Sequence, residues 1–197
     1  MKKIVLLALA LLSFTFSSFA HVTSDSFISD YKGREENVEP DSWVYFAALN
    51  NPSLAAPYIG DVSRNQYFVL KAIGVNEKTM KEKIERLPPN KILAKALTKV
   101  VLSTDAFEGD IKKKAQLEDS FSTILKDIKV LDSSWIKIES KTEEHYEYYI
   151  LYTLNKRTFK EGCDTLLVNV FSNDFQKDDT LKRILRQNLI FCPLLSE

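Results

Sequence analysis

The stretch EEHYEYYILYTLN, residues 143–155, carries the clearest structural signal in the chain. Every even position from 146 to 154 is apolar or aromatic, whereas the odd positions begin with Glu143, His145 and Glu147 and become apolar only at Tyr149. A period of two residues is typical of a β-strand, because successive side chains point to opposite faces of a sheet. The stretch therefore predicts a strand whose aromatic face is turned towards a core.

The surrounding C-terminal sequence indicates more strands and one helix. SSWIKIES, residues 133–140, alternates in the same way, and DTLLVNVFS, residues 164–172, is apolar almost throughout, which favours a central strand. A helix is expected near residues 179–188. LIFCPLL, residues 189–195, is expected to form an edge strand, since Pro193 cannot donate to a neighbouring strand.

The N-terminal half has the spacing of helices, with apolar residues three and four apart. Asn76 is a predicted N-cap and Gly74 a predicted C-cap. The predicted helical stretches are DSWVYFAALNN (41–51), DVSRNQYFVLKAIG (61–74), EKTMKEKIERL (77–87), NKILAKALTKVVLS (90–103) and DIKKKAQLEDSFSTILKDIK (110–129).

This order of elements predicts an α+β fold in a single domain, residues 41–197. An N-terminal helical segment, residues 41–129, is expected to pack on a C-terminal antiparallel β-meander with a last helix, residues 130–197. The helix of residues 111–129 is expected to pack on the face of the strand at 143–155 that carries Tyr146, Ile150 and Leu154. Residues 21–40 are polar and without sustained periodicity, so they are expected to form a loosely ordered leader.

Residues 1–20 have the features of a cleaved secretory signal peptide. Lys2 and Lys3 precede an apolar run, and Ser18 and Ala20 place small residues at a cleavage site. The apolar run is short for a bilayer-spanning helix, and no cysteine lies near the cut to carry a lipid anchor. We therefore expect a protein without a membrane anchor that is periplasmic or secreted.

Cys163 and Cys192 are the only cysteines of the chain. An even number of cysteines in an exported protein usually indicates a structural disulfide. We therefore expect a Cys163–Cys192 bridge, and the wide spacing does not suggest a redox pair.

Composition and motifs exclude several classes of function. Basic and acidic residues balance, at 27 each, which gives no electrostatic reason to bind nucleic acid. The 5 glycines form no phosphate-binding loop, and no Gly-x-Ser-x-Gly motif marks a serine hydrolase. No cofactor is therefore expected.

The two histidines raise the question of a metal site. Cleavage after Ala20 would leave His21 at the N-terminus, where its amine and ring can bind copper together with His145. The polar, aperiodic sequence after His21 speaks against a preorganised site, so no metal is expected. His145 with Glu143 or Glu147 remains an alternative acid–base or metal site, as in a hydrolase or a metal-dependent enzyme.

Tyr146, Tyr148 and Tyr152 share one face of the strand at 143–155. Such a stripe favours a core, but a partly open face of tyrosines beside His145 would suit recognition of a partner. We therefore expect an exported binding protein without catalytic machinery, of an accessory, inhibitor or immunity type, whose partner is another exported protein. A small-ligand carrier with a cavity between sheet and helices is the remaining alternative.

Overall fold

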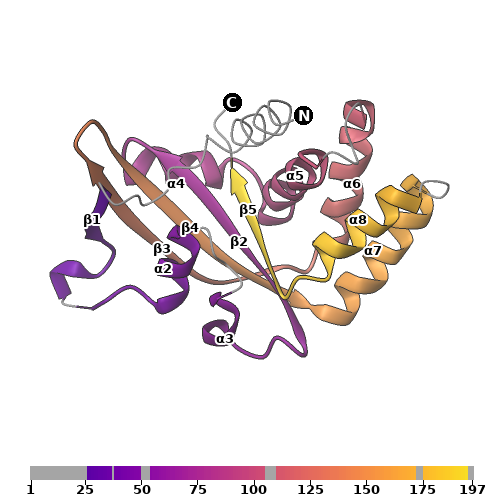
Figure 1. Cartoon of the computed structure of the whole chain (residues 1–197), viewed down its shortest axis with the longest axis horizontal. Coiled ribbons are helices and arrows are strands. Elements are labelled where there is room, and N and C mark those ends of the chain that lie inside the picture. Colours follow the sequence, from indigo (N-terminus) through magenta and orange to yellow (C-terminus); the bar gives the residue numbers. More distant parts are fainter. Residues whose placement is uncertain (1–25, 37, 50–53, 105–109, 172–174, 195–197) are drawn as a thin grey trace, which may run out of the picture.

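The computed structural model describes residues 26–36, 38–49, 54–104, 110–171 and 175–194, and it is an α+β fold built on one five-stranded sheet (Figure 1). The strand order is β1-β3-β4-β2-β5. The strands are β1 (Ser26–Tyr31), β2 (Asn65–Gly74), β3 (Lys129–Ser140), β4 (Glu144–Asn155) and β5 (Leu189–Leu194).

The pair β2–β4 forms the centre of the sheet. The two strands run antiparallel, and their register extends from Asn65 opposite Asn155 to Gly74 opposite Tyr146. β3 pairs antiparallel with both β4 and β1, whereas β5 runs parallel to β2 at the other edge. The sheet is therefore mixed, and the predicted purely antiparallel meander is wrong for β5.

Helices cover both faces of the sheet. α2 (Ser42–Ala48) and α3 (Ala56–Ile59) contribute to a core on one face, with Val69 of β2 and Leu151 of β4. The helices of the other face pack on Phe68 and Ile150. These helices are α4 (Glu77–Glu85), α5 (Pro89–Leu102), α6 (Lys114–Ile124), α7 (Lys156–Phe171) and α8 (Phe175–Leu185), and short 3-10 turns lie at Arg34–Glu36 and Asp110–Lys113.

Several predicted elements are present. The helix that follows Asn76 is α4, and the Asn76 side chain accepts a hydrogen bond from the backbone N–H of Thr79 at 2.9 Å. α2 and α5 also form as predicted, as do β3, β4 and the edge strand β5. Leu117 and Phe121 of α6 pack in the same core as Ile150, as expected for the helix over the even face of β4.

Two predicted elements have the opposite secondary structure. Residues 61–74 were expected to be helical, but residues 65–74 form β2, whose side chains from Gln66 to Ala72 are all buried because both faces of the strand are covered. Residues 164–172 were expected to be a strand, but residues 156–171 form α7. Phe159, Cys163 and Leu166 of α7 are buried at helical spacing, which the apolar run alone did not reveal.

The polar segment before residue 41 contributes a strand. Residues 21–40 were expected to form a loosely ordered leader, but within it Ser26–Tyr31 is β1, which pairs with β3. The register places Phe27 opposite Glu139 and shifts between Ile28 and Asp30, an irregularity of the β-bulge type.

The predicted signal peptide, residues 1–20, lies outside the described residues. Within the described part of the chain, no helix is long and apolar enough to cross a membrane.

The predicted disulfide is absent, because Cys163 and Cys192 are both free and buried. Cys163 lies on α7 and Cys192 on β5, and each packs as a small apolar side chain in the core beneath the helices. Burial and the nearby Asp164 raise the pKa of Cys163 to about 12, and burial raises the pKa of Cys192 as well. Both thiols are therefore protonated and poorly nucleophilic at neutral pH.

We expect both thiols to react with a thiol reagent only after unfolding, and reductant to leave the melting temperature unchanged. The physical reason is that the two sulfurs are buried and not bonded to each other. Thiol titration with and without denaturant measures this directly. A denatured, unreduced protein without reactive thiols would contradict it, since a bridge of this span would stabilise the fold by about 3–4 kcal/mol.

Candidate functional site

The tyrosine face of β4 is divided by the helices that cover it. Tyr152 is buried in the core beneath the helices, and burial raises the pKa of its hydroxyl. Tyr148 is partly buried and packs against the same core, whereas Tyr146, nearer the β3–β4 turn, is also partly exposed. In Figure 1, α5 to α8 gather at one end of the sheet, and β1 with the β3–β4 hairpin lies at the other.

Where β1, β3 and β4 extend past these helices, their side chains form a surface that we call the open face. Residues directly opposite each other on paired strands share a face of the sheet. The register aligns Phe27, Glu139 and Glu144 in one row across the three strands, and it aligns Lys137 and Tyr146 in the next row. The open face comprises Phe27, Trp135, Lys137, Glu139, Glu144 and Tyr146.

Lys137 is the electrostatic centre of the open face. Its ammonium lies 2.8 Å from a carboxylate oxygen of Glu139 and 2.8 Å from one of Glu144. The hydrogen bonds that Lys137 donates to these two carboxylates raise the pKa of Lys137, and the bond to Glu139 lowers the pKa of that carboxyl group. Only 19% of the Lys137 side chain is exposed, against 34% of Glu139 and 64% of Glu144, so the lysine is the member of the triad that the sheet holds most closely.

Aromatic rings surround this charged triad. The ring centroids of Trp135 and Tyr146 are 5.7 Å apart, and the Lys137 ammonium lies 5.9 Å from the Tyr146 centroid. Phe27 on the edge strand β1 is 59% exposed, so its ring is accessible from solvent. Tryptophan, tyrosine and phenylalanine are the side chains enriched at the centres of protein interfaces.

A cleft of about 530 Å³ lies next to the open face, between the segment after β1 and the first half of β3. Trp135 and Tyr31 contribute to its wall, and most of its charged side chains are acidic. Burial and a hydrogen bond from Asp132 raise the pKa of Asp41, because the two carboxyl groups lie together. The Trp43 indole N–H donates to Asp132 at 3.2 Å, which ties this wall to α2.

The opposite face of β4 carries a buried polar network around Glu147. One Glu147 carboxylate oxygen lies 2.6 Å from the ammonium of Lys71 on β2 and 3.4 Å from Nε2 of His145. The other accepts a hydrogen bond from the Tyr149 hydroxyl. The side chains of Lys71 and Glu147 are 1% and 0% exposed, whereas His145 is 15% exposed and forms the edge of the network.

The network sets the protonation of its members. Burial alone would raise the pKa of Glu147, but hydrogen bonds from His145, Lys71 and Tyr149 and the charge of Lys71 outweigh it and lower this pKa. Burial and the adjacent Glu147 carboxylate raise the pKa of Tyr149 well above its ordinary value. Glu147 is therefore ionised and Tyr149 neutral at physiological pH.

The structure brings together some of the residues that the sequence singled out. His145 meets Glu147, as the alternative acid–base site required, whereas Glu143 is exposed at the β3–β4 turn. The sequence analysis did not identify Lys71 as the partner of Glu147, because residues 61–74 were interpreted as a helix. A single lysine within an apolar run was the signal that could have indicated a buried charge. His21 lies outside the described residues, and within the described ranges no three His, Cys, Asp or Glu side chains gather as a possible metal site.

Comparison of the chain with protein-family models, with curated proteins and with solved structures gave no match.

We expect Glu147→Gln or Lys71→Met to destabilise the fold by about 3–5 kcal/mol, because each leaves an uncompensated buried charge or an unpaired buried partner. Lys71→Met combined with Glu147→Gln should cost clearly less than the sum of the two single losses. Urea unfolding measures the three values. Additive losses would contradict the ion pair.

The Glu147 network also has a pH signature. Because the folded-state pKa of Glu147 lies below its unfolded value, its contribution is present above the unfolded pKa and lost as the pH falls through the folded pKa. Glu147→Gln should therefore flatten the acidic part of the stability profile. Glu143→Gln, an exposed neighbour, is the matched control and should leave the profile unchanged.

Proposed function

We propose that the protein is an exported binding protein that engages another protein through its open face. The observation that carries this proposal is the arrangement of the exposed Phe27 and the partly exposed Trp135 and Tyr146 around the Lys137 triad, at the end of the sheet away from α5 to α8. A few anchor residues, with tryptophan and tyrosine prominent among them, supply most of the energy in protein interfaces. The signal-like residues 1–20 support export, and the partner is then another exported protein.

The acidic cleft beside the open face refines the nature of the partner. Its wall carries Asp41, Asp132, Glu36 and Glu39, against Lys32 and Arg34. Complementary charge steers association and fixes the orientation of a complex. The partner is therefore expected to present lysine or arginine side chains next to the apolar patch that meets Phe27.

The buried network supports a structural interpretation of His145 rather than a catalytic one. Glu147 has no exposed surface, and protein groups already hold both of its carboxylate oxygens. A substrate therefore cannot reach this carboxylate without opening the sheet. For this reason we place the proposed function on the open face and not on the His145–Glu147 pair.

Photo-crosslinking tests the proposal at one residue. A benzophenone amino acid in place of Phe27 is expected to give a discrete adduct with one protein of the exported fraction. The same replacement at Tyr58, which is 61% exposed on α3 and outside the open face, is the matched control and should not. Adducts from both positions, none from position 27, or an adduct with the mass of two copies of this chain would each contradict the proposal.

The captured protein also permits a quantitative test with purified components. Tyr146→Ala and Lys137→Glu are each expected to weaken binding by about tenfold or more, the effect of losing one interface anchor. Tyr58→Ala should leave the affinity unchanged. Isothermal titration calorimetry measures the affinities, and circular dichroism confirms that each variant is folded. Unchanged affinity in both open-face variants would contradict the assignment.

A further inference from the structure

A second cavity lies between α7 and α8, and it combines an apolar floor with a basic rim. Its volume is about 240 Å³. It is built from α7, the end of α8 and the start of β2, and none of these segments contributes a residue to the open face. An inference from this cavity is therefore independent of the proposed protein-binding function.

The floor is made by buried side chains. Phe159 and Cys163 of α7 and Leu185 of α8 belong to the main core, and Phe159 packs edge-to-face on Phe68 with centroids 5.1 Å apart. The high pKa of the Cys163 thiol, about 12, keeps it uncharged, so the thiol acts as an apolar wall. Such a surface accepts a hydrocarbon group.

The rim is basic because of the helical spacing of α7. Lys156, Lys160 and Asp164 recur every four residues beside Phe159 and Cys163, so all five lie on the helix face that lines the cavity. Across the cavity, α8 ends with Lys182 and Leu185, and Arg186 follows in the same turn. Among the described residues that line the cavity, four are therefore cationic and one, Asp164, is a carboxylate.

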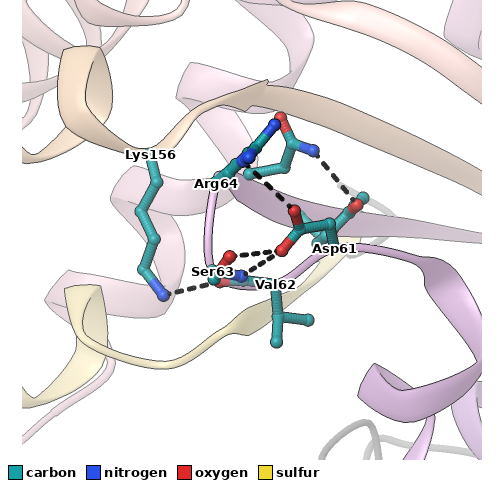
Figure 2. Close-up of polar contacts among 7 residues, drawn as sticks. Asp61, Val62, Ser63, Arg64 and Lys156 are labelled. Atoms are coloured by element: carbon teal, nitrogen blue, oxygen red, sulfur yellow. Dashed lines mark hydrogen bonds and ion pairs between the residues drawn. The ribbon is translucent and has the colours of Figure 1, made fainter.

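Lys156 is held in place by the turn that leads into β2 (Figure 2). Its ammonium donates to the backbone carbonyl of Val62 at 2.9 Å and to the side-chain oxygen of Asn188 at 2.8 Å. The turn is itself fixed, because Asp61 accepts a hydrogen bond from the Ser63 N–H at 2.9 Å and lies 3.6 Å from Nε of Arg64. Both acceptors of Lys156 are neutral, so these contacts position its charge without cancelling it.

We propose that this cavity binds a small amphiphilic carboxylate, a molecule with one anionic head and a short hydrocarbon chain. The chain would lie against Phe159, Cys163 and Leu185, and the carboxylate would lie among Lys156, Lys160 and Arg186. Ligand sites combine mostly apolar walls with a few placed polar groups. Pockets for drug-sized ligands usually have volumes of about 300–1,000 Å³. This cavity is smaller, so we expect it to bind a ligand with a short hydrocarbon chain.

Titration calorimetry on the full protein, with octanoate as the probe below its micelle concentration, tests the site. Inorganic phosphate carries the charge without the chain, and octylammonium carries the chain with the opposite charge. Octanoate is expected to bind at one site, and both comparison probes at least about tenfold more weakly, since each lacks one of the two complementary parts. Equal binding of octanoate and octylammonium, or no saturable binding of octanoate, would overturn the proposal.

Charge variants then assign the binding to this cavity. Lys160→Glu with Arg186→Glu should weaken octanoate binding by about tenfold or more, and Asp164→Asn should strengthen it. Lys81→Glu with Lys91→Glu, which makes the same charge change at exposed positions on α4 and α5, is the matched control and should have no effect. All these changes are at the surface, so the fold is retained. Unchanged affinity in the rim variant, or an equal loss in the control, would overturn the assignment.

Discussion

The antiparallel pairing of β2 with β4 is the constraint on which the rest of the structure depends. It joins the ten residues of β2 to ten of the 12 residues of β4 and places both strands in the interior of the sheet. One face of this pair supports α4 to α8, and the other supports α2 and α3. Because both faces are buried, a shift of the register by one residue would move every core side chain to the wrong side.

The buried Lys71–Glu147 ion pair makes this register specific. A buried ion pair adds little net stability, because removing two charges from water costs about as much as their attraction returns. A shifted register, however, would separate the two charges and leave both without a partner in the interior. The pair therefore acts against wrong pairings more than it strengthens the correct one, and Tyr149 and His145 satisfy the remaining carboxylate contacts.

The two proposed binding regions arise where the helical layer ends or divides. α5 to α8 gather at one end of the sheet, and at the other end Trp135 and Tyr146 remain partly exposed. α7 and α8 meet over the edge of the same layer, and lysine and arginine side chains surround the gap between them. The same sheet thus positions a flat surface for a protein and a small cavity for an anion.

The sequence by itself determined the elements whose pattern is local. The alternation of residues 143–155, the Asn76 cap and the amphipathic spacing of α5 predicted their structures because one exposed and one buried face leave a visible period. It also placed His145 and Glu147 on one strand face, two residues apart.

Only the tertiary structure decided the rest. β2 is buried on both faces, so its sequence does not alternate between polar and apolar residues. Val170 belongs to a helix, although the apolar run around it resembles a strand. Three features depend on which elements pack against each other, and this information is not local in the sequence. They are the ion pair of Lys71 with Glu147, the unbonded state of the two cysteines, and the partial exposure of Tyr146 on the strand face that buries Tyr152.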